Sequence, residues 1–93
     1  MIVSFSDKIC EEILHGHKPK RFPSQLLRIA QRKLFMLQHA VELKDLRSPP
    51  GNRLEPLLGD RKGQYSIRIN DQFRICFEWR DNKAYNVHIA DYH

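Results

Sequence analysis

The hydrophobic residues of this 93-residue chain follow two different periods. In the first half they recur every three to four residues, which is the repeat of an amphipathic helix. From Leu54 onward apolar and polar residues alternate, which is the repeat of a strand with one buried face. This change of period predicts an α+β fold in which helices come first and an antiparallel sheet follows.

Two helices are predicted in the first half. Asp7 is placed to cap the first helix and Gly16 to end it. Pro23 is expected to open the second helix, where its missing N–H does no harm. The outer side of this second helix is basic, and Lys33 is expected to lie there. Its apolar face would comprise Leu26, Ala30, Leu34, Leu37 and Val41.

The second half predicts an antiparallel meander, and residues 2–5 predict a short first strand. Residues 59–63 would form one turn of the meander. Cross-strand neighbours share a face, so a three-residue loop at 70–72 pairs Arg68 with Arg74. The same parity in the next hairpin pairs Trp79 with Tyr85, Phe77 with Val87, and Arg74 with Ala90.

The predicted register places Arg68 and Arg74 opposite each other on the face that the helices leave open. Two like charges in such a pair repel each other, and an anion lying across them would remove that cost. Guanidinium groups can hold a phosphate and stabilise the charge that builds on it, but they cannot act as bases. Alternatively, each arginine is solvated or paired with Asp71 or Glu78.

The chain ends on two groups that can transfer protons, Tyr92 and His93. A disordered terminus is the alternative, although Tyr92 directly follows a predicted strand. Asp91 has the parity of the buried face, so it is expected to fix the terminus rather than to act as a base.

Glu55 is the best-placed carboxylate of the basic half. It could accept a proton from a ribose 2′-OH, and it could equally neutralise Arg53 or Arg61. His15 and His17 flank a helix end and favour a solvated position over a metal site. The chain has no Gly-rich phosphate loop, no GxSxG and no HExxH, so neither a metal nor a cofactor is predicted.

The charge balance favours a polyanionic partner. The net charge is +5 and the pI is about 9.5. Residues 18–33 hold six basic groups and no acid, which indicates either a binding surface or a solvated face.

Cysteine usage and hydropathy bear on where the protein works. The two cysteines, Cys10 and Cys76, form no disulfide framework and are expected to be buried thiols in a reducing cytoplasm. No signal peptide and no membrane span are predicted.

The segment DLRSPPGNRLEPLLGDRKGQYSIRINDQFRICFEW, followed by the terminal DYH, closely resembles the HigB branch of the RelE-type bacterial toxins, including GraT-like members. The similarity covers nearly the whole chain, from the opening IVSF through the RKL-containing helix to the sheet. It implies a RelE-like fold in a single domain over residues 1–93, with two N-terminal helices packed on a twisted antiparallel sheet.

The resemblance also implies an activity, that of a ribosome-dependent mRNA endonuclease that cuts the codon in the ribosomal A site. The ribose 2′-OH would attack the adjacent phosphate without a metal ion. Asp91, Tyr92 and His93 match the family's terminal catalytic set, and Arg74 matches an arginine at the scissile phosphate. Some members carry a histidine at the position of Glu55. The base could therefore be Glu55 or His93 alone, or the activity could be weaker than in those members. Further contacts to RNA are expected from Arg68, Arg61, Lys62, Arg53 and Arg47.

A HigA-type helix-turn-helix antitoxin is the implied protein partner, with DNA contacted only through the toxin–antitoxin complex. Two other functions are compatible with the same residues. The same basic face could bind RNA or the ribosome and block translation without cutting. The chain could also be an interaction subunit that modulates the DNA binding of a partner.

Overall fold

The computed structural model describes residues 1–60 and 63–91. Two helices, α1 (Lys8–Leu14) and α2 (Leu27–His39), precede four strands. Three short 3₁₀ turns lie at Ser24–Leu26, Leu43–Arg47 and Pro50–Asn52. The strands are β1 (Glu55–Pro56), β2 (Gln64–Arg68), β3 (Phe73–Arg80) and β4 (Lys83–Asp91).

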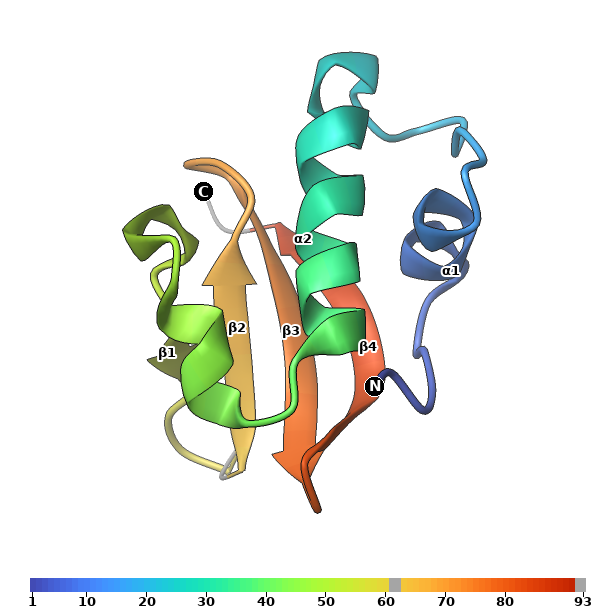
Figure 1. Cartoon of the computed structure of the whole chain (residues 1–93). Coiled ribbons are helices and arrows are strands. Elements are labelled where there is room, and N and C mark those ends of the chain that lie inside the picture. The colour runs from blue at the N-terminus through green and yellow to red at the C-terminus, as the bar shows by residue number, and fades with distance from the viewer. Residues whose placement is uncertain (61–62, 92–93) are drawn as a thin grey trace.

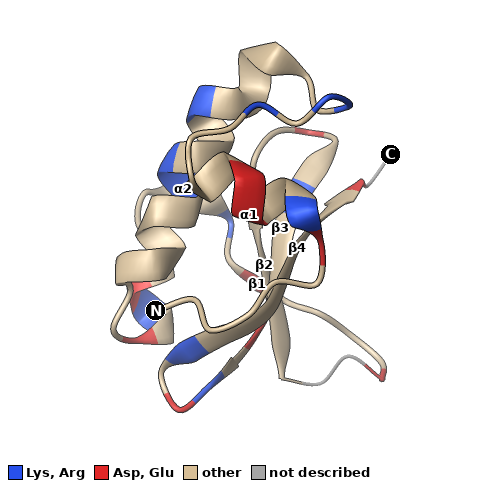
Figure 2. Cartoon of the chain, turned by 90° about the vertical axis from the view of Figure 1, so that its right-hand side faces the viewer, with Lys and Arg blue, Asp and Glu red and all other residues tan. Residues whose placement is uncertain are grey.

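The strands form one antiparallel sheet in the order β1-β2-β3-β4, which confirms the predicted α+β class and the meander. Figure 1 shows α2 crossing in front of the sheet, and Figure 2, turned by 90°, shows α2 on one side of it. Helix α1 packs against α2 and β4. The sheet therefore has one face under helices and one open face. Within the described ranges no helix is long and apolar enough to cross a membrane.

The first helix begins and ends as the sequence predicts. The Asp7 carboxylate caps α1 by accepting a hydrogen bond from the Cys10 N–H at 2.9 Å. Its second oxygen accepts the Ile89 N–H at 2.9 Å, which ties the start of α1 to β4. Gly16 follows the helix with a φ of +84°, a conformation that favours glycine.

The second helix differs from the prediction at both ends and on its outer side. Pro23 precedes a 3₁₀ turn, and the α-helix begins only at Leu27. The helix ends at His39, so Val41 leaves the apolar face and its side chain is 68% exposed. Lys33, expected on the solvent side, is buried at 6% exposure.

Residues 2–5 do not form the predicted strand. They make only two isolated parallel bridges to the edge of β4, Ile2 with Ala84 and Phe5 with Val87. Asn86 lies between these rungs with a φ of +55°, and its N–H is bonded to a serine side chain of the segment instead of its backbone. This irregularity in β4 interrupts the ladder.

The β2–β3 hairpin has the predicted register, with Arg68 paired with Arg74. The predicted register of the β3–β4 hairpin is confirmed at one end, where Arg74 pairs with Ala90. It is wrong at the other end, where Trp79 pairs with Ala84 instead of Tyr85.

The error in the second hairpin has a local cause. Asp81 and Asn82 have φ values of +53° and +59° and make a two-residue turn between Arg80 and Lys83. The predicted pairing of Trp79 with Tyr85 requires a turn of three residues, 81–83. The resulting shift of one residue persists to the bulge between Cys76 and Glu78, so the predicted Phe77–Val87 pairing is not found. Beyond the bulge the predicted parity returns.

The core lies between the helices and the covered face of the sheet. Its largest fully buried side chains include members of α1, α2 and each long strand. Those buried to 1% exposure or less include Ile13, Leu34, Leu37, Ile67, Ile75, Phe77 and Val87.

Candidate active site

Two neighbouring rows of the open face hold the predicted site. In one row Glu55 of β1 pairs with Ser66 of β2, which pairs with Cys76 of β3. In the adjacent row Arg68 pairs with Arg74. Because directly opposed residues share a face, Glu55, Ser66 and both arginines point to the same side of the sheet.

Arg74 is the most firmly held of these side chains. Its Nε donates to the Ser66 hydroxyl at 2.7 Å, and its Nη2 donates to the Arg53 carbonyl at 2.5 Å. The side chain is only 14% exposed. Ser66 is itself 1% exposed, so a buried hydroxyl sets the direction of the guanidinium. The alternation places Ser66 on this face, but its role as an acceptor for Arg74 was not predicted.

Arg68 is more exposed and has an acidic partner. Its side chain is 30% exposed, and its guanidinium forms an ion pair with Asp71 in the loop that follows β2. The alternative that Arg68 is paired with Asp71 is thus confirmed. Glu78, the other acid considered, bonds instead to the side-chain amide of Asn86 at 3.1 Å.

Glu55 lies beside Arg74. One of its carboxylate oxygens is 3.9 Å from Arg74 Nη2, and the side chain is 62% exposed. The carboxylate is therefore accessible from solvent and close to the guanidinium. Among the described residues Glu55 forms an ion pair with Arg74 and not with Arg53. Arg61, the other arginine considered as its partner, lies outside the described residues.

The end of β4 brings one more predicted residue to this region. Asp91 pairs with Phe73 in the ladder, and its Oδ2 accepts a hydrogen bond from Gln72 Nε2 at 3.1 Å. Asp91 is exposed, although its parity had predicted the buried face. Tyr92 and His93, and in the β1–β2 turn Arg61 and Lys62, lie outside the described residues.

Arg53 and Arg47 have different environments. Arg53 follows a 3₁₀ turn with a φ of +44°, and this conformation presents its carbonyl to Arg74. Arg47 lines a hollow of about 420 Å³ together with Leu54 and Tyr65. Leu54 is next to Glu55 and Tyr65 is next to Ser66, so by alternation this hollow lies on the opposite side of the sheet. Arg47 does not join the arginine pair.

Lys33 approaches the same region from the helical side. Its Nζ donates to the Arg68 carbonyl at 2.6 Å. Burial lowers the pKa of the Lys33 ammonium, and the nearby guanidinium groups of Arg68, Arg32 and Arg74 lower it further. The arginine pair thus has a third positive charge on the far side of the sheet, which the sequence pattern did not predict.

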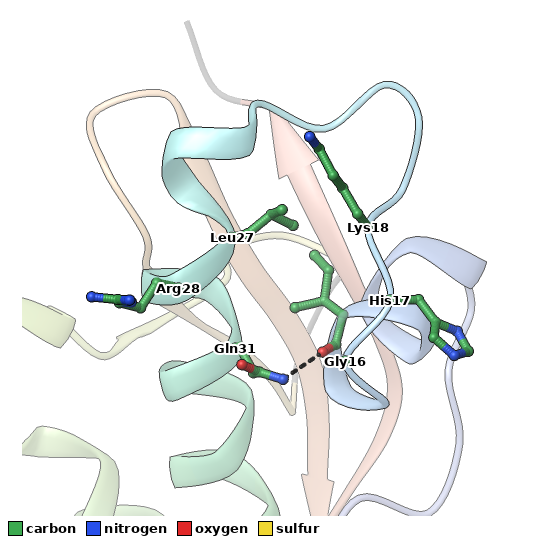
Figure 3. Close-up of a pocket in the computed structure, with 7 residues that line it drawn as sticks. Gly16, His17, Lys18, Leu27, Arg28 and Gln31 are labelled. Atoms are coloured by element: carbon green, nitrogen blue, oxygen red, sulfur yellow. Dashed lines mark hydrogen bonds between the residues drawn. The ribbon is translucent and has the colours of Figure 1, made fainter.

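A separate hollow of about 240 Å³ lies between the end of α1 and α2. Figure 3 shows Gln31 bonded to the end of α1, where its Nε2 donates to the Ile13 carbonyl at 3.2 Å, with Lys18 and Arg28 on opposite sides of Leu27. Its lining contains no residue of the sheet. It is thus distinct from the arginine site.

The chemistry open to the site follows from these groups. Two guanidinium groups and an accessible carboxylate suit an anionic substrate that must lose a proton. Among residues 1–60 and 63–91, no three His, Cys, Asp or Glu side chains are grouped so that they could hold a metal ion.

Comparison with known proteins gives a consistent result. Residues 3–93 match the family model described as the RelE-like toxin of type II toxin–antitoxin system HigB. The chain is 42% identical over 90 residues to Toxin HigB-1 of Vibrio cholerae, covering 96% of this chain and 95% of that protein. It is 30% identical over 93 residues to Endoribonuclease HigB of Proteus vulgaris, covering all of both.

The fold has a solved counterpart. The YoeB–YefM complex from Staphylococcus aureus contains a chain that superposes with a TM-score of 0.57 at 19% identity, covering 100% of this chain and 98% of that one. At this identity the likeness concerns the fold alone.

Proposed function

This chain belongs to the HigB family of RelE-like toxins of type II toxin–antitoxin systems, and from that premise we propose that it is an endoribonuclease that cuts mRNA in the ribosomal A site. The observation that carries the proposal is the contact between Glu55 and Arg74. An accessible carboxylate lies 3.9 Å from a guanidinium that is held by a buried hydroxyl and a backbone carbonyl. A relative that is similar over its whole length is named an endoribonuclease.

The proposed reaction is an intramolecular transfer at phosphorus. Glu55 takes the proton from the ribose 2′-OH, and the 2′ oxygen forms a bond to the adjacent phosphorus. Arg74, with Arg68, stabilises the negative charge that builds on the non-bridging oxygens. The bond from phosphorus to the 5′ oxygen breaks as that oxygen receives a proton. The products are a 2′,3′-cyclic phosphate and a 5′-hydroxyl end, and no metal ion is required.

The proton donor is proposed to come from the end of the chain. Tyr92 and His93 are the candidates, because β4 carries the chain to Asp91 at the row next to Arg74 and Ala90. Asp91, bonded to Gln72, would hold the terminus rather than transfer the proton.

The open site favours dependence on the ribosome. Neither of the two hollows described above includes Arg68 or Arg74 in its lining. RNA would therefore rest on an open sheet face, which provides little of the alignment that in-line attack requires. The ribosome would hold the mRNA in that geometry. Arg53, Arg61 and Lys62 are proposed to contact the RNA backbone at the margin of the face.

The proposed protein partner is an antitoxin of the HigA type, encoded with the toxin and able to bind DNA in the complex. Two findings support it: membership of a type II toxin–antitoxin family, and the similar fold of a chain solved in the YoeB–YefM complex. The basic residues at 18–33 could contact either ribosomal RNA or this antitoxin.

Primer extension on purified components tests the function. The protein is incubated with an mRNA in the presence and absence of programmed ribosomes, and the new 5′ ends are mapped. Cuts within the A-site codon that require ribosomes, and that leave a 5′-hydroxyl, are expected. Tyr92→Phe should lose these cuts and still bind the ribosome.

Two results would contradict the proposal. Equal cutting without ribosomes would make the chain a free ribonuclease. Blocked translation with intact mRNA would favour a non-catalytic inhibitor that uses the same basic face.

The matched control for Tyr92→Phe is Tyr85→Phe, which removes a phenolic hydroxyl at the other end of β4.

A further inference from the structure

Lys33 is a buried charged residue that the proposed reaction does not use directly. It lies in the middle of α2 with 6% exposure, beside Ala30 and Leu34, which are fully buried. Lysine is almost never buried to this degree unless its ammonium is paired. Here the ammonium donates to a backbone carbonyl, that of Arg68, at 2.6 Å.

The surroundings of the Lys33 ammonium are basic. Within the part of the chain that the structure describes, no carboxylate lies within 4.0 Å of its Nζ. The groups that act on its pKa, besides burial, are the guanidinium groups of Arg68, Arg32 and Arg74. A buried ammonium among like charges costs folding free energy, so the free protein gains little from retaining it.

The carbonyl that Lys33 contacts lies at an incomplete edge of the sheet. β1 pairs with β2 only at Tyr65 and Ser66, two residues before Arg68. The next residue, Ile69, bonds to β3 through its N–H to the Phe73 carbonyl at 2.9 Å. Lys33 therefore supplies the donor that β1 does not extend far enough to provide, and it holds the end of β2 where the arginine pair begins.

We propose that Lys33 is a positioning residue for RNA cleavage. From the helical side it fixes the end of β2 at Arg68 and adds a third positive charge behind the Arg68–Arg74 pair. This charge strengthens the binding of the scissile phosphate as negative charge builds on the phosphate in the transition state. This proposal rests on the proposed function. The phosphate would offset the mutual repulsion of the three cations, and Lys33 itself does not touch the substrate.

Two substitutions separate the charge of Lys33 from its shape. Lys33→Met keeps the length and apolar stem but removes the ammonium, whereas Lys33→Arg keeps the charge. In single-turnover cleavage on programmed ribosomes, Lys33→Met should lower the maximal rate on the order of tenfold, because a charge at this range acts through a medium of intermediate dielectric. The ribosome concentration that gives half-maximal rate should change little. Lys33→Arg should restore most of the rate.

The matched control is Lys8→Met, which removes an exposed lysine from α1. It should cleave at the wild-type rate. Denaturation curves are recorded for every variant, so that a loss of rate is compared only between folded proteins. A wild-type rate for Lys33→Met, or equal losses for Lys33→Met and Lys33→Arg, would overturn the proposal.

A second measurement does not depend on cleavage. The Lys33 ammonium is followed by ¹⁵N NMR while inorganic phosphate is added at several pH values. Phosphate at the arginine pair should raise the pKa of Lys33, since a nearby anion favours the charged form. Arg74→Ala should abolish this response. If wild type fails to cut on ribosomes but this response is present, only the proposed function fails. A pKa that phosphate leaves unchanged would contradict the role of Lys33.

Discussion

The two faces of the sheet use the same strands for different purposes. On the covered face, Ile67, Ile75 and Phe77 are buried to 1% exposure or less, and the helices fill the space above them. On the open face, Arg68 faces Arg74 and the nearest carboxylates are exposed. One face is buried within the chain, whereas the other presents two arginines whose acidic partners, Asp71 and Glu55, are themselves exposed. An accessible face of this kind is what the proposed binding of a phosphate requires.

The largest effect is expected from removing a buried side chain on the covered face. Phe77→Ala should lower the free energy of unfolding by about 3–5 kcal/mol, because Phe77 is 1% exposed and its removal leaves a cavity. Chemical denaturation measures the change. Leu58→Ala, at a side chain that is 85% exposed, is the control and should stay within about 0.5 kcal/mol of wild type. Similar values for the two variants would contradict the assignment of the core.

On the open face, Glu55→Gln should affect chemistry and spare stability. Removal of a general base should lower cleavage on the ribosome by roughly 10²–10⁴-fold. The exposed side chain predicts an unfolding free energy close to wild type. The control is Glu12→Gln on α1, which should leave the rate unchanged. A Glu55→Gln protein that cuts at more than half the wild-type rate would transfer the role of base to His93.

Ser66→Ala tests a residue of the open face that is itself buried. Without its hydroxyl the Nε of Arg74 loses a buried acceptor, which should cost about 1–3 kcal/mol of stability. The freed guanidinium should lower cleavage about tenfold, since one misplaced charge-assisted hydrogen bond is worth this order of free energy. Ser6→Ala, at an exposed serine bonded to the Asn86 carbonyl, is the control. An unchanged cleavage rate for Ser66→Ala would mean that Arg74 does not depend on this contact.

The smallest expected effect is a change in the free energy of unfolding at alkaline pH, caused by Lys33. The folded-state pKa of Lys33 is lowered below 10.5, so the unfolded chain binds more protons between the folded-state pKa and 10.5. The free energy of unfolding should therefore rise with pH in this window, by about 1.4 kcal/mol for each unit by which the pKa is lowered. Lys33→Arg, which does not titrate there, should lack this rise. Parallel pH profiles for wild type and Lys33→Arg would contradict the cost assigned to this buried charge.

Strand alternation and loop length were sufficient to predict much of the site from the sequence. The pairing of Arg68 with Arg74 follows from strand alternation and a loop of three residues, and the structure confirms it. The pairing of Trp79 was missed because Asp81 and Asn82 adopt left-handed conformations that short polar side chains tolerate. The bulge between Cys76 and Glu78 then restores the parity, and the alternation of side chains does not reveal such a bulge.

Other features required packing in three dimensions. Lys33 lies on the same helical stripe as Ala30, Leu34 and Leu37. Its helical spacing therefore predicts a buried side chain, whereas its charge predicts an exposed one. In the structure the buried ammonium donates to the Arg68 carbonyl, at the end of β2 that β1 does not reach. The contact of Arg74 with the Arg53 carbonyl depends on a backbone conformation that the sequence alone does not indicate.

The central claim is that the open face cuts RNA and that the covered face only supports it. The most direct test measures single-turnover cleavage on programmed ribosomes and the free energy of unfolding for wild type and Arg74→Ala. We expect cleavage to fall by about 10²–10³-fold, as when one preorganised donor to a transition-state oxyanion is removed. The unfolding free energy should change by about 1–2 kcal/mol at most. Wild-type cleavage by a folded Arg74→Ala protein would contradict the account.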